Sequence, residues 1–143
     1  MINTSDIEKA KRMIKAEKRP IIVKAQDDNF NRKILEYGKF DILLDIESGN
    51  RKDKLKNIDS GFNEVLASIA YKNKVSLAVN LEEIKALPKR GKAMRLSRII
   101  KNLKIARKAG VPIYFLGSKQ NKEVLSLLIS LGASTSQAKE AIF

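Results

Sequence analysis

The chain alternates short apolar runs with longer amphipathic stretches, and this alternation restricts the possible folds more than any other feature. The short runs are rich in aliphatic and β-branched residues, which is typical of buried strands. They are Ile21–Val23, Asp41–Leu44, Val75–Val79 and Val111–Leu116. Strands that alternate with helices indicate an α/β fold with a mainly parallel sheet and surrounding helices. The length of 143 residues fits a single α/β domain, residues 1–143.

Helices are predicted where apolar residues recur three and four positions apart. They are Ser5–Lys18, Asp27 or Asp28 to Tyr37, Gly61–Lys72, Pro88 or Lys92 to Gly110, Ser118–Leu131 and Gln137–Ile142. Ser5 and Glu8 have the spacing of a capping box, and Gly38 fits the left-handed residue that ends a helix. Residues 47–60 are polar and charged, so we expect a long loop there.

Several kinds of chemistry are excluded by residue types that the sequence lacks. It contains no Cys and no His, which rules out disulfides, thiolate or imidazole metal sites, and Ser-His-Asp catalysis. Its longest apolar stretches, such as Val111–Gly117, are far shorter than the roughly 18 residues that suggest a membrane span. Residues 1–6 do not have the pattern of a secretory signal. We therefore expect a cytoplasmic protein with no membrane partner.

Positive charge is concentrated in one segment. The chain has a formal net charge of +13, and residues 88–110 contain nine basic and no acidic side chains. A helical projection places Leu96, Ile99 and Leu103 toward the sheet, and it places Arg95, Arg98 and Lys101 on the sides and back. A solvated helix face would explain such a run, but the absence of any carboxylate among these cations favours a polyanionic partner. Met94 and Ile105 lie within the same basic region and are candidates for a protein contact.

Polar residues follow the predicted strands at the edge where ligands bind in parallel sheets. Asp45 and Glu47 come directly after the second strand, so they could hold Mg²⁺ in a small phosphoesterase. Arg51, Lys52 and Lys54 would form a second basic contact at this edge. Ser60 and Gly61 precede a predicted helix, where they would cap it or leave backbone N–H groups free for a phosphate. The sequence contains neither a Gly-rich phosphate loop nor a nucleophile elbow.

Several segments, in this order, resemble ribonuclease P protein component 3, the archaeal counterpart of a eukaryotic ribonuclease P/MRP subunit. They are residues 31–36 (NRKILE), 40–44 (FDILL), 51–53 (RKD), 59–63 (DSGFN), 98–102 (RIIKN), 106–108 (ARK) and 111–113 (VPI). The resemblance implies a TIM-barrel-like fold on a phosphoesterase scaffold that has lost its metal ligands. The family usually has further strands at its N-terminus, so we expect a partial or reduced barrel. Its unpaired sheet edge would need a partner or self-association.

The resemblance also implies a function, namely a non-catalytic RNA-binding subunit that helps the catalytic RNA remove the 5′ leader from precursor tRNA. The implied partners are ribonuclease P RNA and ribonuclease P protein component 2, with precursor tRNA contacted indirectly. No cofactor is expected on this chain, and Mg²⁺ would serve the catalytic RNA. We expect no catalytic and no metal-binding residue. The candidate RNA-binding residues are Arg51, Lys52, Lys54, Lys89, Arg90, Lys92, Arg95, Arg98 and Lys101, and the candidate protein-interface residues are Met94 and Ile105.

Two other functions remain open from the sequence. A diverged basic scaffold protein would use the same helix to bind an acidic partner. A Mg²⁺-dependent phosphoesterase would use Asp45 and Glu47. Asn63 and Asn102 are expected to make structural helix contacts rather than to read RNA.

Overall fold

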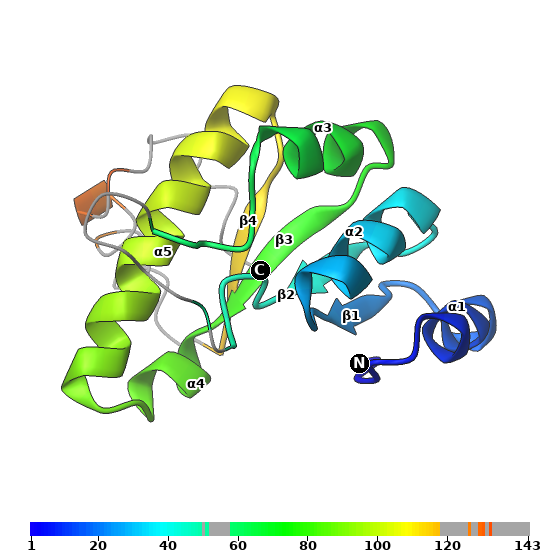
Figure 1. Cartoon of the computed structure of the whole chain (residues 1–143), viewed down its shortest axis with the longest axis horizontal. Helices are drawn as coiled ribbons and strands as arrows, with labels where there is room; N and C mark the ends of the chain where they lie inside the picture. The colour runs from blue at the N-terminus through cyan, green and yellow to red at the C-terminus, as the bar shows by residue number, and fades with distance from the viewer. Residues whose placement is uncertain (50, 52–57, 118–125, 127–128, 131, 133–143) are drawn as a thin grey trace.

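A computed structural model describes residues 1–49, 51, 58–117, 126, 129, 130 and 132. In this part of the chain, one sheet contains four strands, β1 (Ile22–Lys24), β2 (Ile42–Leu44), β3 (Ser76–Asn80) and β4 (Ile113–Leu116). The strands are parallel and lie in the order β1-β2-β3-β4 (Figure 1). The predicted α/β class with a parallel sheet is therefore confirmed.

Helices connect the strands and form a row along the sheet (Figure 1). They are α1 (Ile7–Ala16), α2 (Asp28–Tyr37), α3 (Glu64–Lys72), α4 (Leu81–Lys85) and α5 (Lys89–Ala109). The long helices pack in the sequence α1, α2, α3, α5, each against the next. Because right-handed crossovers that always advance in one direction place their helices on one face, this is the arrangement of a segment of a β/α barrel.

The two faces of the sheet bury different apolar clusters. The large core lies between sheet and helices and includes Val23, Leu43 and Leu77 from neighbouring strands. A smaller cluster lies on the opposite face, around Ile42 and Leu44. Because successive strand residues point to opposite faces, the nearly continuous apolar strands serve both clusters. This two-sided burial also agrees with the predicted partial TIM-barrel-like fold.

Helix ends agree with the sequence prediction only in part. Asp6 caps α1 through the backbone N–H groups of Glu8 and Lys9, so the predicted capping box from Ser5 is wrong. Asp27 caps α2, and Gly38 ends it with a left-handed φ of 67° as predicted. The predicted start of the third helix near residue 61 is also wrong, because α3 begins at Glu64.

The outer edge of β1 is partly covered by the beginning of the described chain. The backbone N–H of Ile2 donates to Ile22 O at 2.8 Å, and the N–H of Lys24 donates to Ile2 O at 2.8 Å. This short parallel bridge protects part of the edge for which we expected a partner.

The helices predicted within 118–131 and 137–142 lie largely or wholly outside the described residues, as do Lys52 and Lys54.

Candidate nucleic-acid interface

A buried cluster of ionic side chains lies where the strands end. Lys24 Nζ is 2.5 Å from Asp45 Oδ2 and 3.2 Å from Glu83 Oε2. Arg95, from α5, places Nη2 2.8 Å from Glu47 Oε1 and 3.5 Å from Asp45 Oδ1, and its Nη1 is 3.2 Å from Glu83 Oε1. We call these five residues the ion cluster. It ties the ends of β1 and β2 to α4 and α5.

Burial decides the electrostatics of the ion cluster, because Asp45 is 0% and Glu47 1% exposed. Burial raises the pKa of the Glu47 carboxyl, and the Arg95 guanidinium opposes that rise. Burial also raises the pKa of Asp45, against hydrogen bonds from Lys24 and from the Asn80 backbone N–H. Each carboxylate is therefore held by a cation or an N–H group that was brought to it by another element.

The pKa values of Lys24 and Glu83 are shifted in the direction that favours their charged forms. Burial by itself would lower the pKa of Lys24, but Asp45 and Glu83 stabilise the ammonium and raise that pKa above its ordinary value. Burial also opposes ionisation of Glu83, but hydrogen bonds from Lys24 and Arg95 hold its pKa below the usual range. The pairing therefore favours the charged forms of Lys24 and Glu83, whereas burial opposes ionisation of Asp45 and Glu47.

The backbone at Asp45 adopts a left-handed conformation, with φ 58°, that turns the chain sharply after β2. Asp45 N–H donates to Ala78 O at 2.8 Å, and Ser48 Oγ donates to Asp45 O at 2.7 Å. The Asp45 side chain accepts from the Asn80 N–H at 2.8 Å. These bonds hold a conformation that is uncommon for residues other than Gly, and they direct the Asp45 carboxylate into the ion cluster.

The donor set of the ion cluster does not fit a Mg²⁺ site. Mg²⁺ requires several free oxygen ligands in octahedral geometry, whereas Lys24 and Arg95 already contact the oxygens of Asp45 and Glu47. Within the described ranges, no group of three or more His, Cys, Asp or Glu side chains is placed to hold a metal ion. The arrangement links structural elements instead of presenting carboxylates to a metal or a substrate.

A polar stripe on α5 faces the protein interior and holds the loop after β2. Arg98 Nη1 donates to Glu47 O at 3.0 Å, and its Nη2 donates to Arg51 O at 3.3 Å. Lys101 Nζ donates to Ile58 O at 2.6 Å, and Asn102 Nδ2 donates to Ser60 O at 3.2 Å. Residues three and four positions apart share one helix side, so these donors meet carbonyls spread along the segment between residues 47 and 60.

This stripe corrects part of the helical projection. Arg95 and Arg98 were expected to point away from the sheet, but they are only 6% and 4% exposed. Lys101 is half-buried. The physical reason is that the loop carbonyls and the carboxylate of Glu47 satisfy these cations inside the protein, which the spacing of α5 alone does not reveal. The described contacts of these three residues are with the protein itself.

Arg51 also points inward, although it was expected to be part of a basic contact at the strand ends. Its guanidinium donates to Ile46 O at 3.1 Å and pairs with Asp59 at 3.0 Å and Asp28 at 2.8 Å. Gly61 makes room for it, because a Cβ there would lie 2.6 Å from Arg51 Nη2 and 2.3 Å from Ile46 O. The Arg51 side chain is 7% exposed and organises the loop.

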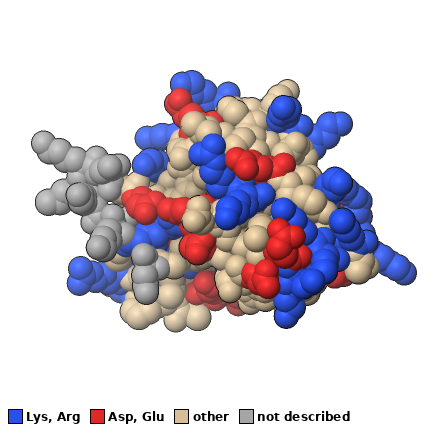
Figure 2. All heavy atoms as spheres, turned by 45° about the vertical axis from the view of Figure 1, so that its right-hand side comes forward, with Lys and Arg blue, Asp and Glu red and all other residues tan. Residues whose placement is uncertain are grey.

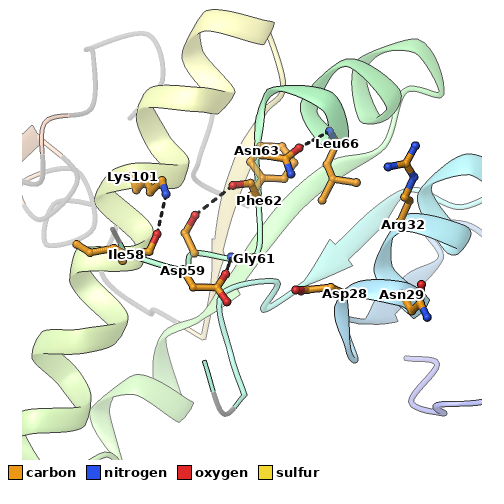
Figure 3. Close-up of a pocket in the computed structure, with 11 residues that line it drawn as sticks. Asp28, Asn29, Arg32, Ile58, Asp59, Gly61, Phe62, Asn63, Leu66 and Lys101 are labelled. Carbon is orange, nitrogen blue, oxygen red and sulfur yellow. Dashed lines mark hydrogen bonds between the residues drawn. The ribbon is translucent and has the colours of Figure 1, made fainter. Parts of the chain in front are cut away.

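A hollow of about 610 Å³ lies between the starts of α2 and α3 (Figure 3). Arg32 and Lys101 lie on opposite sides of it, with Asp59 between them (Figure 3). Ser60 and Gly61 do not cap α3, because Asn63 does, and their contacts do not favour the alternative of a phosphate site. Ser60 is buried and donates to Phe62 O, and the Gly61 N–H already donates to Asp59 Oδ1 at 3.1 Å.

Asn63, on the wall of this hollow, accepts the N–H of Leu66 at 2.9 Å, which is the structural role expected for it. The contact of Asn102 with the Ser60 carbonyl is likewise structural. Both contacts agree with the structural role expected for the two asparagines, although the buried Asn102 Oδ1 accepts no hydrogen bond from the described residues.

The exposed predicted cations lie at the corner between α4 and α5. Lys89, Arg90 and Lys92 are solvent-exposed and form no ion pair with any described carboxylate. Met94 is 36% exposed beside them, whereas Ile105 packs against the main core. The expectation that Ile105 forms an exposed contact is therefore weakened by its position. We call Lys89, Arg90 and Lys92 the α5 corner.

Sequence reasoning missed Lys24 and Glu83 as members of the ion cluster. Lys24 could have been found, because it ends a strand beside the strand that Asp45 follows. Glu83 could not, because its position depends on how the short helix α4 folds back toward α5.

No helix within the described residues is long and apolar enough to cross a membrane.

Fold and site together define an α/β protein built like part of a barrel, with a closed ionic site and a basic exterior. No family model matches the chain. "Ribonuclease P protein component 3" of Methanococcus maripaludis (strain C7) is 26% identical over 111 residues, which are 78% of this chain and 45% of the relative. The resemblance inferred from the sequence to the ribonuclease P protein component 3 family is thereby confirmed.

A solved structure is also similar. A chain in the cryo-electron microscopy structure of archaeal ribonuclease P with mature tRNA superimposes with a TM-score of 0.78 and 23% identity. The match covers 98% of the present chain and 62% of that chain. The fold is therefore shared, while the present chain spans less than two thirds of either similar protein.

Proposed function

We propose that the chain is a non-catalytic RNA-binding subunit of ribonuclease P, and that it supports the catalytic RNA in removing the 5′ leader from precursor tRNA. The observation that carries this proposal is the similarity to ribonuclease P protein component 3 in sequence and to a chain of archaeal ribonuclease P in fold. A basic protein with a net charge of +13 also suits a polyanionic partner.

The ion cluster supports a non-catalytic role. A phosphoesterase needs metal ligands or a general base that can reach substrate, but Asp45 and Glu47 are buried and paired with Lys24 and Arg95. In this proposal, Mg²⁺ is bound by the catalytic RNA and the chain carries no cofactor. The protein contributes positive charge and shape, which supply affinity for folded RNA without reading its sequence.

Within the predicted RNA-binding set, the α5 corner would contact the phosphates directly. Lys89, Arg90 and Lys92 project from the first turn of α5 with no carboxylate partner among the described residues. Arg51, Arg95, Arg98 and Lys101 would act indirectly, because they fix the loop and the start of α5 behind this corner. Each phosphate contact made by the corner would release counterions and make binding dependent on salt.

Met94 gives the same corner an apolar element that suits a protein neighbour. We assign this neighbour to ribonuclease P protein component 2, with precursor tRNA contacted through the assembled enzyme. Assembly with these partners is expected to take place in the cytoplasm.

The test is a reconstitution from the cognate ribonuclease P RNA, protein component 2 and precursor tRNA at modest Mg²⁺, with and without this chain. We expect cleavage of the 5′ leader to be strongly stimulated by the chain, and the stimulation to be lost in Lys89→Glu/Arg90→Glu. The matched control is Lys104→Glu/Arg107→Glu, which reverses two exposed cations near the other end of the same helix. Absence of stimulation with intact RNA and component 2 would overturn the proposal.

A second candidate is a diverged basic scaffold protein with an acidic protein partner. The exposed Met94, which lies among unpaired cations, favours this second candidate, because apolar anchor residues are typical of protein interfaces. Ribonuclease treatment of a pulldown separates the two candidates. An RNA subunit loses its partners when RNA is digested, whereas a scaffold protein keeps its acidic partner.

A further inference from the structure

The surface formed by α1 and α2 carries positive charge that the proposed function does not use. Figure 2 brings this side of the molecule forward and shows many Lys and Arg side chains, with smaller groups of Asp and Glu side chains among them. The exposed cations are Lys9, Arg12, Lys15, Lys18, Lys33 and Lys39. None of the six forms an ion pair with a described carboxylate. We call this surface the α1–α2 face.

Three carboxylates near the α1–α2 face are paired with cations of the same region. Glu8 pairs with Lys11 at 3.5 Å, and Glu36 pairs with Arg32 at 3.0 Å. Asp41 pairs with Arg19 and also accepts the backbone N–H of Ile21 at 2.6 Å. Each of these pairs joins one carboxylate to one cation of the same region and leaves its net charge unchanged. The six exposed cations without an ion pair still outnumber the exposed carboxylates without one, which are Asp6, Glu17 and Asp27.

Two ammonium groups meet at one aromatic ring on the α1–α2 face. Lys11 Nζ lies 5.5 Å and Lys39 Nζ 5.4 Å from the centre of the Tyr37 ring. The ring attracts both cations through its quadrupole, although the two repel each other. Lys11 Nζ also pairs with Glu8 at 3.5 Å, whereas Lys39 forms no ion pair with a described carboxylate, so an anion at this point would be attracted chiefly by Lys39.

Helix stability does not explain the charge on α1. Cations near a helix C-terminus are favourable, which accounts for Lys15 in the last turn. Lys9 lies in the first turn, where the helix dipole disfavours a cation, and Arg12 lies near the middle. Arg12 and Lys15 are three residues apart and therefore project from the same side of the helix.

The chemistry of the α1–α2 face fits RNA better than a protein. Protein interfaces are anchored by exposed aromatic or aliphatic side chains. The large exposed hydrophobic residues of the described chain are Met1, Val65, Tyr71, Met94 and Ile129, and none belongs to α1 or α2. Nucleic-acid interfaces, by contrast, are polar and strongly basic.

We infer that the α1–α2 face is a second RNA-backbone-binding surface, separate from the α5 corner and held together by the Lys11–Tyr37–Lys39 contact. The identity of its ligand rests on the proposed function. The helix row places α1 at one end and α5 at the other, with α2 and α3 between them. The chain would therefore contact folded RNA at two separated points, through phosphates at both.

The test measures RNA affinity of the whole chain against salt concentration for Arg12→Glu/Lys15→Glu. The probes are the cognate ribonuclease P RNA and an unrelated folded RNA of equal length. We expect Kd to rise roughly tenfold for both RNAs, and the slope of log Kd against log salt to fall by about two, because two phosphate contacts are lost. The charge-matched control is Lys72→Glu/Lys74→Glu, which changes exposed residues outside both surfaces and should move Kd much less.

Three outcomes would overturn the inference. One is a Kd for Arg12→Glu/Lys15→Glu that equals that of the control, with an unchanged circular dichroism spectrum. Another is unaltered RNA binding together with lost binding to protein component 2, which would identify an acidic protein ligand. The third is weakened binding by Arg12→Lys/Lys15→Arg, which keeps the charge. Lys89→Glu/Arg90→Glu in the same assay keeps the two proposals distinguishable, because loss of binding in that variant alone leaves the proposed function standing.

Discussion

Replacing Arg95 by Met tests whether the ion cluster holds the fold together. Arg95 reaches Glu47 at 2.8 Å, and Glu47 is 1% exposed. Met fills much of the volume of the arginine stem without its charge. The variant therefore leaves the Glu47 carboxylate buried and deprived of its counter-charge.

Removing one partner of a buried ion pair typically costs about 3–5 kcal/mol of unfolding free energy, because the remaining charge stays desolvated. We expect Arg95→Met to fall in that range. The contact of Arg95 with Glu83 adds little to this expectation, because Glu83 is 40% exposed and solvent screens it. A loss of this size would be a large share of the roughly 5–15 kcal/mol that stabilises a typical domain.

Urea unfolding at several pH values provides the measurement. Burial raises the pKa of Glu47 and Arg95 opposes the rise, so removing Arg95 should raise that pKa further. An acid with a raised folded-state pKa stabilises the fold below its unfolded pKa, and this contribution is lost as the pH rises through the folded value. The deficit of Arg95→Met relative to the unaltered chain should therefore be smallest in acid and should grow toward neutral pH.

The double variant Arg95→Met/Glu47→Leu is the control, since it removes both charges and leaves apolar groups. It should be more stable than Arg95→Met alone, because no unpaired carboxylate remains at position 47. A deficit below about 1 kcal/mol, or one that does not change with pH, would refute the idea that the ion cluster carries stability.

Three further changes test the loop and the helix row. Gly61→Ala should cost about 2 kcal/mol or more in urea unfolding, because φ is +74° and the new Cβ would lie 2.3 Å from Ile46 O. Arg98→Met should lower the thermal stability clearly, because the loop carbonyls of Glu47 and Arg51 lose their hydrogen-bond donor. Lys104→Met, on the exposed side of α5, should change the thermal stability little. Asn73→Ala should cost about 1–2 kcal/mol through loss of the 2.7 Å hydrogen bond to Leu35 O. If Arg98→Met and Lys104→Met are equally stable, or if Asn73→Ala is as stable as the unaltered chain, these assignments are contradicted.

The sequence predicted the sheet because its strands carry a local signal. The runs at Ile21–Val23 and Val75–Val79 lie within one residue of β1 and β3, since aliphatic stretches of this length have few other stable arrangements. Helix starts were harder to place. Asp6 and Asn63 cap α1 and α3 instead of the residues that local spacing favoured, because several neighbouring side chains could serve and packing selects one.

The candidate site was less predictable because it depends on contacts between distant segments. The projection of α5 assumes that cations face solvent, but Arg98 meets carbonyls about 50 residues earlier in the chain. Spacing can show that Arg95 and Arg98 share a side with Ile99 and Asn102, but it cannot show that a loop with unsatisfied carbonyls lies opposite them. The cations of the candidate interface therefore fall into two groups that the sequence alone does not separate, buried ones that hold the loop and exposed ones at the α5 corner.

This division changes how the net charge of the chain should be interpreted. Lys24, Arg51, Arg95 and Arg98 contribute to the +13, but each is engaged by carboxylates or carbonyls within the protein. In the two proposals, an RNA would meet the exposed cations of the α5 corner and the α1–α2 face, at opposite ends of the helix row, while further exposed cations such as Lys72, Lys104 and Arg107 lie outside both. Counterion release depends on cations that reach phosphates, so the salt dependence of binding should follow these two surfaces and not the total charge.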